Sequence, residues 1–418
     1  MKKRPAPEDP SEKEPMRTQI FHSLDEIQEK PWNQLASPDF PFLEYHFLRA
    51  LETTNCLGRR TGWMPVYITV WNDHSLEGAT VAYLKDNSYG EYIFDFAWAQ
   101  ASNAYKIPYY PKIVLAVPFT PATGSKLLLR RGLTEHAQNA VTILLLESLK
   151  ETCRATESSS IHALFISKSE LDLFQAAGFF IRHSFQYHWR NRLYDHSLIP
   201  SCKNEIEFYY STFTDFLSSL KGKRRREISR ERAQVSASGV TVERLTGDQL
   251  EPRHAELFYR FYSDTVDKRG GNEYLTDAFF QQVFKTMKDK ILFVLARDIN
   301  GEPVAGALYY LGRETLYGRH WGCLAEYRAL HFELCYYQGI EFAIERRMKL
   351  FEAGAQGEHK FNRGFLPSLT YSAHLIENPI TRELISDFVT REQTEIERVL
   401  LEYSEHSPFQ NISVGSPA

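Results

Sequence analysis

The 418-residue chain is poor in cysteine: it has five, and none of them stands in a Cys-x-x-Cys pair. This pattern argues against zinc and disulfide scaffolds and favours a reducing compartment. No apolar run approaches the ~18–20 residues that span a bilayer, and no apolar segment follows the basic residues at the start, as an export signal would require. We therefore expect a cytoplasmic protein without a transmembrane segment.

The sequence also lacks an excess of either charge. Its 49 Lys and Arg against 53 Asp and Glu give a net charge of −4, which excludes a dedicated polyanion binder and confines any phosphate site to a local cluster. No His or Cys spacing matches a metal motif, so no metal site is expected. Hydrophobic content of 43% and charged content of 24% are typical of a soluble globular protein.

Hydrophobic periodicity divides the chain into two successive α/β units of similar length and element order, which suggests a duplication at the level of the fold. The length agrees with two domains, since one domain takes roughly 150 residues. We expect a disordered leader over residues 1–16, a first domain over 17–205, a second over 206–403 and a flexible tail over 404–418.

The sharpest charge anomaly lies between Lys221 and Arg232, where seven cations and two carboxylates give a local charge of 7 − 2 = +5. Guanidinium groups match phosphate oxygens bidentately, so the segment predicts a site for a phosphate-bearing substrate. Its candidate residues are Arg224, Arg225 and Arg226. The alternative is a solvated helix face, because Glu227 can pair with Lys223 or Arg230 along a helix.

The segment from Leu330 to Arg347 is apolar almost all round, which predicts a buried helix with a few polar side chains inside. Helical spacing places polar residues on two sides. One side has His331, Cys335 and Gln338, and the other has Glu333, Tyr337 and Glu341. Buried carboxylates need cations or a wet cleft. Glu333 and Tyr337 are therefore substrate-binding candidates, and an internal structural network is the alternative.

A predicted strand over Lys349–Gly354 then runs into a glycine-rich polar loop that ends at Gly364. In open α/β sheets, ligands bind beyond the carboxyl ends of the strands, where glycines allow close approach of the backbone. Glu358, His359 and Lys360 are the candidate catalytic residues, because together they offer proton transfer and anion binding. Glu352 and Arg363 are candidate substrate ligands. A surface loop without such a role remains the alternative.

Several segments together resemble the FemAB-like proteins, N-acyltransferases of the GNAT superfamily that are connected with peptidoglycan biosynthesis or recognition. The resemblance covers most of the chain. It is carried by Tyr109–Lys112, Val117–Pro121, His188–Asn191, the basic segment, Tyr317–Gly322 and the run Leu330–Phe365. It implies an α/β fold of the α+β type with tandem GNAT-like domains, each a mixed twisted sheet flanked by helices.

The resemblance also implies an enzyme that transfers an acyl or aminoacyl group to an amine on a small molecule or peptide. It adds His320 and Trp321 to the substrate-binding candidates. The chain lacks the Arg/Gln-x-x-Gly-x-Gly/Ala loop with which acetyl-CoA users of this superfamily cradle the pyrophosphate. This favours aminoacyl-tRNA as donor, with acyl-CoA as the alternative and no tightly bound cofactor. A non-catalytic protein that recognises a peptidoglycan-like ligand is a third reading, and the oligomeric state stays open.

Overall fold

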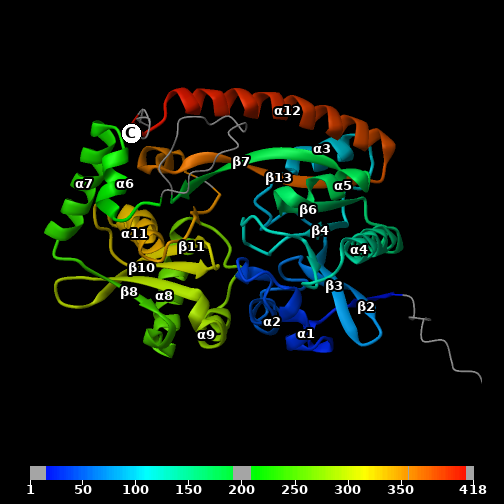
Figure 1. Cartoon of the computed structure of the whole chain (residues 1–418), viewed down its shortest axis with the longest axis horizontal. Coiled ribbons are helices and arrows are strands. Elements are labelled where there is room, and N and C mark those ends of the chain that lie inside the picture. Colours follow the sequence, from blue (N-terminus) through cyan, green and yellow to red (C-terminus); the bar gives the residue numbers. More distant parts are fainter. Residues whose placement is uncertain (1–15, 192–208, 356, 411–418) are drawn as a thin grey trace, which may run out of the picture.

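The computed structural model describes residues 16–191, 209–355 and 357–410. Within them the chain alternates helices and strands in two successive units, on the right and left of Figure 1. The first unit contains β1 (Arg17–Phe21), α1 (Glu29–Leu35), α2 (Tyr45–Thr53), β2 (Met64–Asn72), β3 (Ser75–Lys85), α3 (Phe96–Ala104), β4 (Lys112–Leu115), β5 (Leu127–Leu129), α4 (Glu135–Ala155), β6 (Ser160–Ile166), α5 (Leu171–Ala176) and β7 (Phe180–Arg190).

The second unit repeats this rhythm. It contains α6 (Phe213–Ser219), α7 (Gly222–Ala237), β8 (Thr241–Thr246), α8 (Pro252–Lys268), α9 (Asp277–Thr286), β9 (Ile291–Arg297), β10 (Pro303–Leu311), β11 (Thr315–Cys323), α10 (Leu330–Phe332), the π-helical turn η6 (Glu333–Tyr337), α11 (Gln338–Glu345), β12 (Leu350–Glu352), the 3₁₀ helix η7 (Glu358–Arg363), β13 (Leu366–Ile376) and α12 (Pro379–Glu405). The predicted α/β fold class is thus confirmed.

All strands join one mixed sheet in the order β1-β2-β3-β4-β6-β13-β7-β12-β11-β10-β9-β8, with β5 on β3. Each unit holds one parallel pair, β4 with β6 and β11 with β12. A helix connects the two strands of each pair, as parallel neighbours require. The second pair positions the candidate site.

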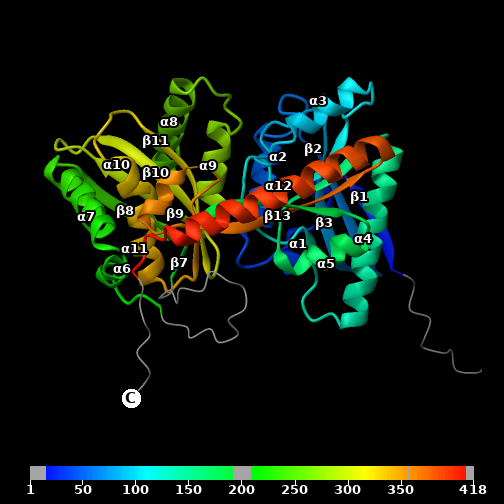
Figure 2. The same ribbon diagram turned by 90° about the horizontal axis from the view of Figure 1, so that it is seen from above.

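The two units exchange their last strands. β13 of the second unit pairs with β6 of the first, while β7 of the first unit pairs with β12 of the second. β7 and β13 also pair with each other and run between the two halves beneath α12 (Figures 1 and 2). Neither unit therefore completes its sheet alone. The predicted domain boundary at 205/206 lies outside the described residues, as do residues 1–15 of the leader.

The first part of the segment expected to be a flexible tail is packed against the second unit. Phe409 is buried in the core, the Lys221 amide donates to the Pro408 carbonyl oxygen at 2.8 Å, and the Gln410 amide donates to the Ser219 carbonyl oxygen at 2.9 Å. One aromatic side chain docked between α6 and α7 fixes this stretch, and a polar sequence gives little sign of that. Residues 411–418 lie outside the described part.

The helix expected over Leu330–Arg347 is present but is interrupted by the π turn η6. A π turn inserts one residue into the helical register, so positions five apart come to lie one above the other. Gln338 consequently donates to Glu333 at 2.8 Å, although ordinary helical spacing places these residues on different sides. No helix in the described ranges is long and apolar enough to cross a membrane.

Candidate active site

The candidate site lies where the parallel strands β11 and β12 end at the same edge of the sheet. After β12 the chain turns through Gly354 and Gly357, forms η7 and turns again at Gly364. All three glycines have positive φ, at 82°, 112° and 87°, which other residues adopt with difficulty. The glycines thus fold the loop back, and Lys360 on η7 is held beneath it.

Lys360 is the most deeply buried of the predicted catalytic residues, with 2% of its surface exposed. Its ammonium donates to the Gly354 carbonyl oxygen at 2.8 Å, and no carboxylate pairs with it among the described residues. Burial lowers the pKa of Lys360 to about 8, with Cys335 acting against this shift and Arg319 adding to it. The ammonium can donate three hydrogen bonds, and the described residues accept one of them.

Arg319 is a second cation at this edge, and it owes its position to a β-bulge. The pairing of β10 with β11 passes from Leu308 opposite His320 to Tyr309 opposite Gly318, so Arg319 is the extra residue. Bulges redirect side chains and are frequent beside active sites. Arg319 donates through Nη2 to the Phe119 carbonyl oxygen, while its buried Nε has no hydrogen-bond partner in the described structure.

The sequence reasoning did not select Arg319, although it used the segment Tyr317–Gly322 for the family resemblance. Two glycines, Gly318 and Gly322, lie inside this strand. An isolated glycine within a strand is a signal for a bulge or a close backbone approach. That signal was available in the sequence and points to the residues between the glycines.

Four further aromatic and imidazole side chains form the mouth of the site. His359 Nε2 lies 2.9 Å from the Tyr336 hydroxyl, and the His331 ring packs edge-on against Trp321 with centroids 5.1 Å apart. Burial lowers the pKa of His331 to about 4 and also lowers the pKa of His359. Both rings are therefore neutral at pH 7, and a neutral imidazole can accept a proton.

Two predicted residues lie away from this mouth. Glu358 is exposed. Burial is the main cause that raises the pKa of Tyr187 on β7, followed by the Tyr403 hydroxyl, and the charge of Glu358 makes a smaller contribution in the same direction. His320 packs instead against Tyr262 and Phe280 of α8 and α9. Neighbouring positions of a strand point to opposite faces, which separates His320 from Trp321.

Glu333, Tyr337 and Arg363, expected to contact substrate, instead form an internal network with α7. Arg232 binds Glu333 through two hydrogen bonds of 3.0 and 3.1 Å and Glu341 through one of 3.0 Å.

Arg363 in turn donates to Glu231 at 2.6 and 3.2 Å and to the Tyr337 hydroxyl at 2.9 Å, and Tyr337 itself donates to Glu231. In both clusters the arginine and the acids are hydrogen-bonded to each other. The alternative of an internal structural network therefore describes these residues better than a wet cleft does. Their effect on the site is to position it, because Arg363 also donates to the His359 carbonyl oxygen at 2.8 Å.

Glu352, also a predicted ligand, is buried at the end of β12 and accepts a hydrogen bond of 3.2 Å from the Thr123 amide of the first unit. Burial raises the pKa of Glu352 to about 7, against the lowering effect of this bond and of Lys126. The side chain thus joins the two units behind the site.

The basic segment forms α7, and its two sides differ. Ile228, Glu231 and Val235 are buried against the second unit. Arg224 pairs with Glu227 at 3.0 Å. Arg225, Arg226 and Arg230 are exposed and have no hydrogen bond or ion pair within the described ranges. Both alternatives for this segment therefore apply, each to a different side of one helix.

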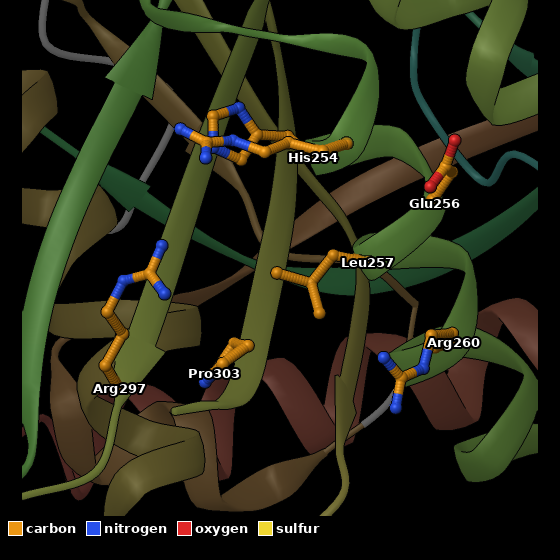
Figure 3. A pocket seen from close by; sticks show the side chains of 7 residues that line it. His254, Glu256, Leu257, Arg260, Arg297 and Pro303 are labelled. Carbon is orange, nitrogen blue, oxygen red and sulfur yellow. The ribbon is translucent and has the colours of Figure 1, made fainter. Parts of the chain in front are cut away.

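A pocket of about 260 Å³ opens elsewhere on the second unit, between α8 and the adjoining ends of β9 and β10 (Figure 3). Three arginines line it together with His254 and Leu257. Two of them are matched by acids: Arg253 pairs with Glu251 at 2.9 Å, and Arg297 pairs with Glu243 at 2.9 Å. Among the described residues, this pocket lacks a pair of cations without acidic partners, such as Lys360 and Arg319 form beside η7.

The fold and the site define a class: two successive α/β units that share one mixed sheet, with two cations beyond the second parallel strand pair. The sequence matches the FemAB-like family, described as peptidoglycan biosynthesis/recognition, over residues 23–411. The chain belongs to this family, which confirms the resemblance and indicates a transferase. No curated protein sequence matches it.

Three solved structures are similar to the chain. FemX has 14% identity and a TM-score of 0.49, and the match covers 88% of this chain and 99% of FemX. The C-terminal domain of a protein named as a lysylphosphatidylglycerol synthetase, from Agrobacterium fabrum, has 8% identity and a TM-score of 0.50, with 86% and 95% covered. A Bacteroides thetaiotaomicron protein of unknown function has 10% identity and a TM-score of 0.50, with 86% and 99% covered.

Proposed function

We propose that the protein is an N-acyltransferase that moves an aminoacyl or acyl group from a phosphate-bearing carrier to an amine. The observation that carries this proposal is a pair of cations, the buried Lys360 and the partly exposed Arg319, which have no carboxylate partner among the described residues. Preorganised donors in a desolvated site stabilise the oxyanion of acyl transfer, and removal of one costs roughly 10²–10³ in rate.

The remaining groups can carry out the proton transfers that this reaction needs. The acceptor nitrogen forms a bond to the carbonyl carbon, and the bond from that carbon to the carrier oxygen then breaks. The proton leaving the nitrogen can pass to the neutral His359 imidazole and from there to the carrier oxygen. The protonated Lys360, with Arg319, would hold the carbonyl oxygen while it is negative.

Aminoacyl-tRNA is the donor we propose, because the exposed cations of α7 lie on the helix that packs against η7. Through Glu231 and Arg363 the inner side of α7 fixes the loop that bears Lys360. A polyanion bound on the outer side would lie about one helix diameter, ~10 Å, from that loop. The family description, and the name of the Agrobacterium relative, support aminoacyl transfer as the chemistry.

The test is a thermal-shift and binding panel with charged tRNA, acyl-CoA esters and nucleotide-linked muropeptides. We expect charged tRNA to raise the melting temperature. Arg225→Ala, Arg226→Ala and Arg230→Ala together should weaken tRNA binding and reduce the salt slope by roughly two to three. The matched control removes three exposed cations elsewhere: Lys106→Ala, Lys168→Ala and Arg328→Ala.

The panel also decides between the alternatives. Stabilisation by an acyl-CoA ester, without any by tRNA at low salt, would replace the donor but keep the reaction class. Stabilisation by a muropeptide, with no transfer to it from either donor, would overturn the proposal in favour of a recognition protein. Transfer that survives Lys360→Met unchanged would remove the proposed site.

A further inference from the structure

The segment from Asn87 to Tyr105, in the first unit, inverts the usual distribution of side chains. Its two acids, Glu91 and Asp95, are buried, whereas five of its six aromatic side chains are exposed and Trp98 alone is buried. Tyr89, Phe94 and Phe96 are 59%, 57% and 41% exposed. Buried charges and exposed aromatic rings are the reverse of what folding alone selects, which makes this surface informative.

Buried lysines hold the segment from below. Lys112 donates to Ser88 at 2.8 Å and to Glu91 at 2.9 Å, and it also pairs with Asp95. The Tyr89 carbonyl oxygen accepts from Lys85 at 3.1 Å and from the Trp63 indole at 3.2 Å. The exposure of the rings is therefore fixed by a buried ionic network that anchors the backbone beneath them.

The rings form one cluster, which we call the aromatic surface: Tyr89, Phe94 and Phe96. Phe94 stacks on Phe96 with centroids 6.1 Å apart and an interplanar angle of 22°, and Tyr89 lies 6.0 Å from Phe96. Contiguous exposed apolar patches on soluble proteins mark sites of interaction rather than ordinary surface.

The charge of the surroundings indicates what kind of partner fits. Between Asn87 and Tyr105 no charged side chain is exposed, and the two exposed charged residues that flank the segment, Asp86 and Lys106, have opposite charges. The basic outer side of α7 is at the opposite end of the molecule from α3 (Figures 1 and 2). The aromatic surface therefore has no excess of either charge and matches a partner that is apolar and without net charge.

The surface is continuous with the candidate site. Tyr92 lies between Tyr89 and Phe94 in the chain, and it is near enough to Arg319 to raise the pKa of the guanidinium against the larger lowering effect of burial. The Phe119 amide donates to the Gly90 carbonyl oxygen at 3.1 Å, and the Phe119 carbonyl oxygen accepts from Arg319. An amphiphile held by the rings would thus have its polar end near the two cations.

We propose that the aromatic surface docks the protein on a lipid–water interface with zwitterionic headgroups. Tyr and Phe side chains on a rigid loop insert their rings at the boundary between headgroups and acyl chains, and this contact requires no anionic lipid. This surface function goes beyond the transfer chemistry and does not depend on it.

The test is flotation with phosphatidylcholine vesicles at 0.1 and 0.5 M NaCl. We expect the full chain to float equally at both salt concentrations, because apolar burial is not screened. Tyr89→Ser, Phe94→Ser and Phe96→Ser together should reduce the bound fraction at least tenfold. The control variant, Ile143→Ser, Ile299→Ser and Leu401→Ser, removes three other exposed apolar side chains and should float as the wild type does.

Three results would overturn the proposal. They are absence of flotation, equal loss in the control variant, and release by 0.5 M salt, which would assign docking to charged groups. A fourth is a dimer in sedimentation velocity that disappears in the aromatic variant, because the rings would then cover a second copy. Transfer to a water-soluble amine should be unchanged in the aromatic variant, which separates failure of docking from failure of the proposed reaction.

Discussion

The two parallel strand pairs end in crevices that contain the same residue type in opposite states. Lys126 lies beyond β4 and β6, Lys360 lies beyond β11 and β12, and burial lowers the pKa of each to about 8. Lys126 donates to two carbonyl oxygens, at Gly124 and at Phe165, whereas Lys360 donates to one, at Gly354. The fold thus supplies Lys126 with two hydrogen-bond acceptors and Lys360 with one.

The chain segments around the two lysines also differ, in how deeply they are buried. Every residue from 112 to 122 is buried, so the chain that follows β4 closes the first crevice. Residues 318–321 on β11 remain partly exposed, and Arg319 keeps a donor without a partner there. A duplicated architecture thus holds two buried lysines differently, and the difference is the number of backbone carbonyls offered to each lysine.

The largest expected effect separates the two lysines. Lys360→Met should lower kcat/KM of transfer by roughly 10²–10³, because it removes an oxyanion donor. Lys126→Met should leave kcat/KM within about threefold, although it leaves two carbonyls without their donor. Steady-state kinetics of both variants at pH 7, with melting curves to confirm folding, measure this. Equal losses in the two variants would end the distinction between the crevices.

Replacement of Arg319 should have the next largest effect. Arg319→Met should reduce kcat/KM by about a hundredfold if its free Nε–H faces the reacting oxygen, whereas Arg319→Lys should recover part of this loss by restoring the charge. The informative measurement is the ratio of the two variants. A structural role in holding the Phe119 carbonyl alone predicts similar kinetics for both.

The pH dependence should follow Lys360. With a pKa of about 8, the fraction of charged Lys360 falls about tenfold between pH 7 and pH 9, and kcat should fall with it. Lys360→Arg should move this loss beyond pH 10. The same group contributes to stability in the opposite sense: its folded pKa is below the unfolded value, so the unfolded state binds more protons between pH 8 and 10.5 and stability rises there.

The effect of Lys360 on the pH dependence of stability is measured by the difference in unfolding free energy between the wild type and Lys360→Met. The difference should shift in favour of the wild type by up to about 3 kcal/mol from pH 8 to 10.5, since one pKa unit corresponds to about 1.4 kcal/mol. A flat difference over this range would show that the folded pKa of Lys360 is ordinary.

The smallest effect on activity concerns the carboxylates that support each crevice. Glu231 binds Arg363 beneath η7, and Glu170 accepts the Lys126 and Leu127 amides at 2.6 and 2.8 Å. Both Glu→Gln variants should lose about 1–3 kcal/mol of stability in denaturant unfolding. Only Glu231→Gln should also lose activity, by a few-fold, because η7 carries Lys360. A similar loss in Glu170→Gln would contradict this.

Much of the candidate site could be located from the sequence. The buried helix from Leu330 and the glycine-rich loop to Gly364 stand next to each other in the chain, so their proximity needed no knowledge of the fold. Arg319 was out of reach by that reasoning, because a bulge is a property of the pairing between β10 and β11. The partner of Glu231 was equally hidden, since Arg363 is 132 residues away.

The sequence by itself determined the alternation of helices and strands, the family, and the presence of a polar loop after the last core helix, because these depend on local periodicity and on adjacent residues. Only the tertiary structure decided that the last strands of the two units change places, that Arg232 and Arg363 are used within the protein, and that Lys360 is left with a single carbonyl. These outcomes depend on which distant groups meet in a low-dielectric interior, where each buried charge must find its partner across the sheet.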